Sequence, residues 1–263
     1  MRETSSANPQ LQERIRGYAP QALRGPVLGA LAAMYPRLDW APRPLRARTM
    51  LAELALESAE GYFHNACLVK DGLRQRLYSP CLKADLQGYR AVELVSRHMA
   101  EAGTDDPLGR AQYADIKTYL PGDILTKVDR ASMANSLEVR APLLDHQLVE
   151  WAAGIPAGCK LSHGQGKYIF KRALESYVPS PLLYRPKQGF SIPLADWLRG
   201  PLRHSAEAAI SGTELADSGL LDVRFLHRLF TEHQAGRCDH GTVLWSIMCF
   251  EAFLHRVHDG TAH

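Results

Sequence analysis

Apolar side chains recur at the period of an α-helix along much of the chain. Residues 89–100 follow this period, and so do residues 223–235 and 241–257 near the C-terminus. A further helix is predicted to follow Gly166 and to end before Pro179, because a residue that precedes proline disfavours helical geometry. On the first of these helices the expected apolar side holds Ala91, Leu94, Val95 and Met99. No set of alternating strands accompanies them, so the pattern predicts a mainly α chain.

The N-terminal part of the chain has a different composition. Residues 1–50 are rich in proline and arginine, and the prolines are expected to break any long helix, leaving short helices joined by turns. Helical periodicity begins at Leu51, and the stretch 57–61 is expected to end it. We therefore expect a Pro/Arg-rich N-terminal helical segment over 1–110 and a C-terminal helical part over 111–263.

The middle of the chain carries the most informative helical pattern. One predicted helix ends at Pro121-Gly122, since this pair is typical of turns. The next begins near Asp123, a favourable N-cap residue, and places Asp123, Lys127 and Arg130 on one face. Another helix is predicted to start at Asp145. Its expected buried side chains are Leu148, Val149, Trp151 and Ala152.

Charged side chains are concentrated among apolar ones between Tyr119 and Asp145. They are Asp123, Lys127, Asp129, Arg130, Glu138, Arg140 and Asp145. The simplest interpretation is a surface helix with ion pairs at i and i+4, each worth about 0.2–0.5 kcal/mol. Glu138 and Arg140 alternate with apolar neighbours, which predicts a short extended segment with its charges on one face. Charges that close to a core usually need partners.

Two further lysines stand in turn-forming stretches. The stretch from Tyr184 to Phe190 is predicted to be a loop, in which Lys187 is a point charge suited to contact phosphate. An ordinary surface lysine is the alternative. Lys167 ends the stretch Ser162–Lys167 at a predicted helix start, a position that attracts anions. This stretch is not a Walker A loop, because the glycine spacing is absent and Tyr168 stands where Ser or Thr would hold Mg²⁺.

Composition excludes several classes of function. The net charge is +3, although residues 1–50 carry eight arginines against three acidic residues. Neither aromatic interleaving nor a reading motif accompanies that charge, so no nucleic-acid partner is expected. Neither a signal peptide nor a membrane span is predicted, and the five scattered cysteines indicate free thiols in a reducing cytoplasm. The histidines form no metal-binding pattern, so no metal site is expected.

These stretches together resemble the asparagine synthetase family of glutamine-dependent amidotransferases. Leu120–His146 matches the family's L-P-x-D-x-L-x-K-x-D-R-x-S-M-A-x-x-L-E-x-R-x-P-x-L-D-H stretch nearly throughout. Gly166–Ala173 matches the G-K-x-x-x-K-x-A element, and Arg185–Phe190 matches the R-x-K-x-G-F loop. The likeness is specific over about 110–205 and weaker on either side.

The resemblance implies both a fold and a reaction. The fold would be the helical C-terminal half of an adenine-nucleotide-α-hydrolase-like (PP-loop) α/β synthetase domain, with the nucleotide-binding sheet largely missing. The reaction would use ATP with Mg²⁺ to adenylate a small carboxylate substrate, aspartate by family default, and ammonia from a glutaminase domain would then form the amide. By the same likeness Lys187 is catalytic and meets the pyrophosphate. The residues that would bind ATP or pyrophosphate, or form the site wall, are Asp129, Arg130, Glu138, Arg140 and Lys167.

Several family elements do not occur in the sequence. The S-G-G-x-D-S and S-G-x-G-x-D-E segments are absent, and Arg2 follows Met1 where the family's glutaminase domain has a catalytic cysteine. We therefore expect a fragment or one piece of a split enzyme, inactive alone, which holds no cofactor tightly and needs the missing N-terminal part or a second copy of itself. The alternative is a non-catalytic helical binding module that keeps this fold and docks a partner on its apolar surface. An upstream reading frame with the two missing segments would favour the first.

The missing glycine-rich segments lead to a direct prediction. The purified 263-residue chain should release no pyrophosphate from ATP in the presence of aspartate, because the backbone amides that would hold the phosphates are not in its sequence. A pyrophosphate-release assay checks this, with the reaction lacking aspartate as the control. Robust aspartate-dependent release would contradict it.

Overall fold

The structure is a computed structural model, and helices dominate the part of the chain that it describes. The sheet structure found there is one two-stranded hairpin, which confirms the prediction of a mainly α chain. The described residues are 21–34, 51, 55–186 and 192–258. They fall into two compact units, which are treated separately below.

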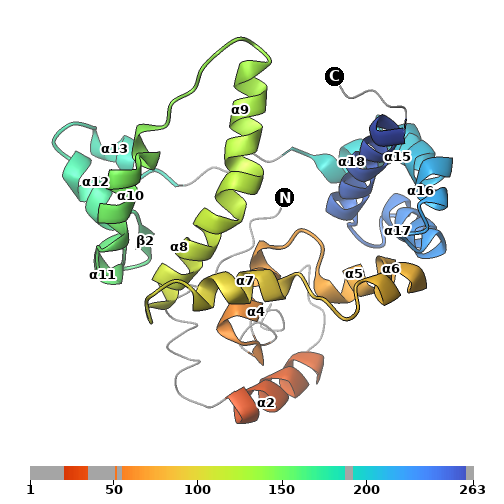
Figure 1. Cartoon of the computed structure of the whole chain (residues 1–263), viewed down its shortest axis with the longest axis horizontal. Helices are drawn as coiled ribbons and strands as arrows, with labels where there is room; N and C mark the ends of the chain where they lie inside the picture. Colours follow the sequence, from red (N-terminus) through yellow and green to blue (C-terminus); the bar gives the residue numbers. More distant parts are fainter. Residues whose placement is uncertain (1–20, 35–50, 52–54, 187–191, 259–263) are drawn as a thin grey trace. The chain divides into compact units, whose positions relative to one another are not determined.

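The first unit contains residues 66–90 together with the described residues from 192 onward. Two of its helices match the predicted segments 223–235 and 241–257 closely, which confirms both predictions. The helices of this unit are α5 (Asp71–Leu77), α6 (Pro80–Asp85), α14 (Leu194–Arg199), α15 (Arg203–Ile210), α16 (Thr213–Asp217), α17 (Val223–Gln234) and α18 (Gly241–His258). In Figure 1, α15 to α18 are coloured in blue shades and lie side by side.

A single apolar core holds these helices together. α15, α16 and α17 pack against α18, and α5 packs against α17. The largest apolar side chains that are completely or almost completely buried there are Leu198, Ile210, Leu215, Leu226 and Leu244. Burial of one such side chain contributes about 1.5–3 kcal/mol relative to leaving it exposed, so this core accounts for the cohesion of the unit.

His233 is completely buried near the end of α17 and joins three parts of the first unit. Its Nδ1 accepts a hydrogen bond from the backbone N–H of His240 at 3.1 Å, so Nε2 carries the proton and donates to the Ala195 carbonyl at 3.2 Å. The Arg199 side chain donates to the carbonyl of His233 at 2.8 Å. Burial, and then the Arg199 guanidinium, lower the pKa of His233, although Asp239 opposes this from 3.8 Å.

This lowered pKa predicts acid sensitivity of the first unit. The folded state binds a proton at His233 less readily than the unfolded state does, so the stabilisation is complete above the unfolded pKa of about 6.5 and is lost as pH falls below it. The free energy of unfolding of the wild-type chain should therefore fall between pH 7.5 and pH 5.5. The His233→Gln variant should have a lower free energy of unfolding at pH 7.5, and this free energy should fall less between the two pH values. Urea unfolding at both pH values measures this. His227→Gln, an exposed change on the same helix, is the control and should keep the wild-type difference.

The second unit contains the described residues 21–34, 51, 55–65 and 91–186. Its small core groups Val95, Met99 and Ala114 with Tyr62 and Phe63. Its helices and strands are α2 (Gln21–Met34), α4 (Ser58–Ala66), α7 (Val92–Ala100), α8 (Pro107–Lys117), η2 (Leu120–Leu125), α9 (Thr126–Met133), η3 (Pro142–Leu144), α10 (His146–Ala153), α11 (Ala157–Lys160), β1 (Leu161–Ser162), β2 (Gln165–Gly166), α12 (Tyr168–Leu174) and α13 (Ser180–Leu183).

Three local predictions for the second unit differ, wholly or in part, from the structure. α2 runs for 14 residues with Pro26 inside it, because a proline removes only one helical hydrogen bond and the neighbouring bonds remain. The stretch 57–61 follows the end of the preceding helical run, as predicted, since residues 56 and 57 are not helical, but α4 already begins at Ser58 within it, because the aromatic residues that follow pack into the small core. On α7 Val95 and Met99 are buried as predicted, but Val92 is the third buried residue, whereas Leu94 is 36% exposed.

The helix expected to stop at Pro121-Gly122 continues through it. The backbone widens there into the π-helical turn η2, so that α8 and α9 form one continuous ribbon (Figure 1). Gly122 N donates to Thr118 O at 3.0 Å, and Thr126 Oγ1 donates to Pro121 O at 2.7 Å. A wider turn accommodates the proline ring, which would otherwise clash with the preceding turn. Asp123 consequently lies inside this helical run and is not an N-cap, which corrects the prediction.

Candidate functional site

The charged stretch identified in the sequence lies on η2, α9 and the connection from α9 to α10. Asp129 and Arg130 are exposed on α9. The Oδ1 atom of Asp123 and the Nζ atom of Lys127 are 3.8 Å apart with i, i+4 spacing, which confirms the simplest interpretation for that pair. Both side chains are more than half exposed, so the pair contributes at most about 0.5 kcal/mol.

Glu138 and Arg140 lie in the connection between α9 and α10. Arg140 Nε donates to Glu138 Oε1 at 2.9 Å, so each charge has the other as its partner. The segment pairs with no strand among the described residues, and the charges are 71% and 84% exposed. Leu137 and Val139 are also more than half exposed. The expectation that these charges lie against a core is therefore wrong for the described structure.

Asp145 is an N-cap, as predicted. Its Oδ1 accepts hydrogen bonds from the backbone N–H groups of Gln147 at 3.0 Å and Leu148 at 3.3 Å, and α10 follows directly. The prediction that Trp151 is buried on this helix was wrong, since 65% of it is exposed. Leu148, Val149 and Ala152 are half-buried, so the described residues cover the predicted apolar face of α10 only in part.

Lys167 follows a β-hairpin that was not predicted from the sequence. β1 and β2 pair Leu161 with Gly166, and the two residues between the strands, His163 and Gly164, have positive φ angles of 50° and 75°. Such values are typical of tight hairpin turns. Lys167 itself has φ 58° and ψ 34°, and it is exposed at the start of α12. The available signal for the hairpin was the pair His163-Gly164, because two residues that end in glycine favour a tight hairpin turn.

Lys187, the predicted catalytic residue, lies outside the described residues. The residues leading to it are described and form contacts that the sequence reading missed. Tyr184, at the end of α13, donates from its hydroxyl group to Glu175 Oε1 at 2.5 Å. The same oxygen accepts from Arg172 NH1 at 3.1 Å, and Lys171 Nζ lies 5.4 Å from the centre of the Tyr184 ring.

The described candidate residues do not form one constellation. Glu138 and Arg140 contact each other. Within the part of the chain that the structure describes, no hydrogen bond or ion pair joins Asp129, Arg130 or Lys167 to another candidate. No group of three His, Cys, Asp or Glu side chains in the same ranges could hold a metal ion. No described helix is both long and apolar enough to cross a membrane.

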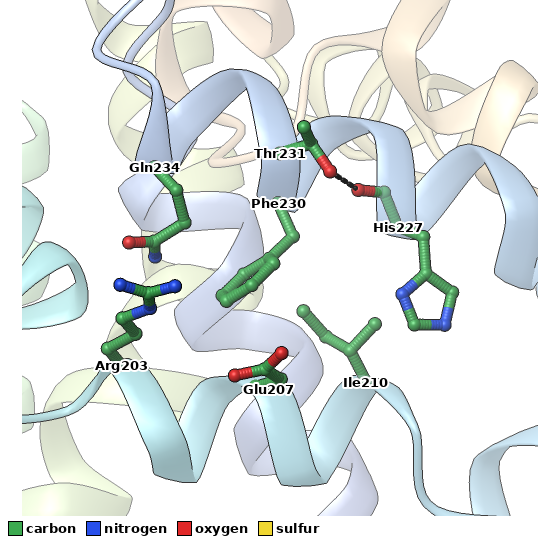
Figure 2. A pocket seen from close by; sticks show the side chains of 7 residues that line it. All are labelled: Arg203, Glu207, Ile210, His227, Phe230, Thr231 and Gln234. Atoms are coloured by element: carbon green, nitrogen blue, oxygen red, sulfur yellow. Dashed lines mark hydrogen bonds between the residues drawn. The ribbon is translucent and has the colours of Figure 1, made fainter.

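A shallow pocket of about 290 Å³ lies elsewhere, in the first unit between α15 and α17. Figure 2 shows Phe230 projecting from α17 towards Arg203, Glu207 and Ile210 of α15. None of the candidate residues lines it.

Comparison with known proteins decides the family. A model of the asparagine synthase family matches residues 10–255, which is nearly the whole chain. The chain belongs to the asparagine synthase family. The resemblance found in the charged motifs is thereby confirmed. The match covers the positions of all the candidate residues and extends through both units.

Several curated relatives align with the chain. It is 36% identical over 210 residues to a putative glutamine-hydrolysing asparagine synthetase of Mycobacterium tuberculosis (strain ATCC 25618 / H37Rv), covering 80% of this chain and 31% of the relative. It is 29% identical over 234 residues to glutamine-hydrolysing asparagine synthetase 1 of Bacillus subtilis (strain 168), covering 88% and 34%. The chain thus spans about a third of the length of these relatives. No solved structure matches it at a significant level.

The family motifs lie in a part of the second unit whose side chains are all at least partly exposed. From Asp115 to Pro186 no residue is buried. The large apolar side chains in this segment that are more than half exposed are Tyr119, Met133, Leu137, Val139, Leu143, Trp151, Tyr177 and Leu182. So many exposed large apolar side chains in one segment are typical of a surface that meets another segment or chain.

The Asp145 cap generates a stability prediction for this motif residue. Asp145→Ala should lower the free energy of unfolding by about 1 kcal/mol, because two N–H groups at the start of α10 lose their acceptor. Asp145→Asn should retain most of the stability, since its amide oxygen can still accept. Urea unfolding of the chain measures both. A loss as large for Asn as for Ala would show that the charge, and not the cap, matters.

Proposed function

We propose that this chain supplies the C-terminal helical part of a synthetase site that activates a small carboxylate with ATP. The observation that carries the proposal is the family match over residues 10–255, together with the motif charges at Asp129, Arg130, Glu138 and Arg140. In the complete site the carboxylate, aspartate by family default, attacks the α-phosphorus of ATP and pyrophosphate leaves. Ammonia from glutamine then displaces AMP and forms the amide.

The charged side chains of this chain would act by stabilising the negative charge that develops during the reaction. Negative charge grows on the departing pyrophosphate, and a fixed cation beside it lowers the barrier. We assign this role to Lys187, and we assign the site wall to the pair Glu138–Arg140 with Asp129 and Arg130. Lys167 would meet phosphate from the start of α12. Mg²⁺ would arrive with ATP, because this ion usually keeps several waters and binds through phosphates and only one or two carboxylates.

The exposed apolar segment supports a further part of the proposal. We infer that residues 111–263 are the C-terminal helical part of a PP-loop α/β synthetase domain and that 1–110 lead into it. The nucleotide-binding sheet, with the two glycine-rich segments, would cover the surface that includes Leu137, Val139 and Trp151. Each Å² of apolar surface covered contributes about 25 cal/mol, so this surface can hold a partner firmly.

The same apolar surface favours one competing function, a helical module that binds a partner without catalysis. The two differ in their dependence on ATP. Combining the chain with a polypeptide that carries both glycine-rich segments should produce carboxylate-dependent pyrophosphate release if the synthetase proposal is right. Association without any such release would favour the binding module.

Substitution of Lys187 in that complete enzyme tests the catalytic assignment. Lys187→Ala should lower kcat by about a hundredfold or more, because losing one cation that opposes transition-state charge costs roughly 3 kcal/mol. The effect on KM should be smaller, since the interaction strengthens only as pyrophosphate leaves. Lys187→Arg should not restore the rate fully, as a planar fork does not replace a compact point charge. Steady-state kinetics with pyrophosphate detection measures all three enzymes.

Lys127→Ala is the matched control for Lys187→Ala. Lys127 pairs with Asp123 on an exposed helical face, so its loss should change kcat far less. If Lys187→Ala kept a near-normal kcat, the assignment would be wrong. The Glu138–Arg140 pair would then be the next group to test.

A further inference from the structure

Tyr184 and Glu175 tie together the ends of two consecutive helices. Glu175 is the C-cap residue of α12, and Tyr184 is the C-cap residue of α13. The Tyr184 hydroxyl group donates to Glu175 Oε1 at 2.5 Å, which is within the range of a short, charge-assisted O–H···O⁻ hydrogen bond. The contact spans nine residues and closes the turn that contains Pro179. It therefore restrains the point at which the chain leaves α13.

The setting of Glu175 indicates that the contact is specific. A carboxylate at a helix C-terminus is opposed by the helix dipole, so this position is unfavourable for glutamate by itself. Here the same oxygen accepts from Tyr184 and from Arg172 NH1 at 3.1 Å, and Lys171 lies over the Tyr184 ring. The hydrogen bond to Glu175 raises the pKa of Tyr184. Two cations, Arg172 and Lys171, thus lie beside the Glu175–Tyr184 pair.

The contact matters because Tyr184 lies directly before a family motif. Arg185 and Pro186 follow it directly and open the R-x-K-x-G-F loop of the family motif. Proline fixes its own φ angle, and it disfavours helical geometry at the residue before it. Little backbone freedom therefore remains between the anchored Tyr184 ring and the residue that follows Pro186. That residue is Lys187, for which a catalytic role is proposed above.

We propose that Tyr184 and Glu175 are positioning residues of the synthetase reaction, which set the direction in which the lysine-bearing loop leaves α13. This inference rests on the proposed function of Lys187. It assigns no contact between Tyr184 or Glu175 and the substrate. Positioning of this kind affects the rate because a reacting group displaced by about 1 Å can cost up to a hundredfold in rate.

The contact itself is tested on the isolated chain. With tyrosine rings labelled by ¹³C, NMR follows the titration of Tyr184, which Tyr184→Phe identifies. Glu175→Ala should lower the pKa of Tyr184 towards its ordinary value of about 10, because the carboxylate acceptor is lost. An unchanged pKa would mean that the contact is absent, and the inference would be overturned.

The consequence is tested in the complete synthetase, formed by this chain with the glycine-rich segments. Tyr184→Phe and Glu175→Ala should each lower kcat about tenfold with little change in KM, and the double variant should lose no more than either single one. Glu175→Gln should keep most of the rate, since its amide oxygen still accepts from the hydroxyl group. Tyr177→Phe is the matched control, because Tyr177 is 82% exposed and its hydroxyl group has no partner in the described structure.

The outcomes separate the two proposals. If the unmodified complete protein releases no pyrophosphate, the proposed function fails. If it is active and Tyr184→Phe keeps its kcat, or if Tyr177→Phe loses as much as Tyr184→Phe, the positioning role is refuted while the function stands. Selective, non-additive losses at Tyr184 and Glu175 with rescue by Glu175→Gln would support the inference.

Discussion

Burial of apolar surface divides this chain into a part that holds itself together and a part that does not. In the first unit, Leu226 and Leu244 interdigitate with partners from α14, α15 and α16 and are completely buried. From Asp115 to Pro186, by contrast, no residue is buried, and the structure there consists of short helices and one hairpin joined by turns. Helices as short as α10 to α13 are marginal in water without tertiary packing. The motif-bearing segment therefore gains little stability from burial within the described structure.

The same constraint governs the chemistry of the charged residues. Glu138, Arg140 and the Asp123–Lys127 pair are all strongly exposed in the described chain. Charges in water interact weakly, because solvent and salt screen them, whereas a water-excluded site strengthens every one of these interactions. Stabilisation of a departing pyrophosphate requires the second situation. Covering the apolar segment would thus assemble the fold and strengthen the electrostatics in one step.

Local backbone chemistry explains where sequence reasoning succeeded in detail. The Asp145 cap and the apolar faces of α17 and α18 depend on residues close together in sequence, so a pattern of spacing was enough to predict them. The π-helical turn at Pro121-Gly122 was not predictable in this way, because the local preference for a turn competes with packing of the helices on either side. The Tyr184–Glu175 contact was missed for a similar reason, as it joins side chains across a turn whose geometry the sequence does not specify.

The sequence by itself determined the helical character of the chain and its family, because both are encoded in short-range spacing: the 3.6-residue period and the order of charged and apolar residues from Leu120 to His146. It also predicts the residues of the candidate site by type, and these stay predictions. Only the tertiary structure decided which apolar faces are covered and which charges have partners. Trp151 has the pattern of a core residue and is nevertheless 65% exposed. Periodicity defines a face, but burial depends on what packs against it.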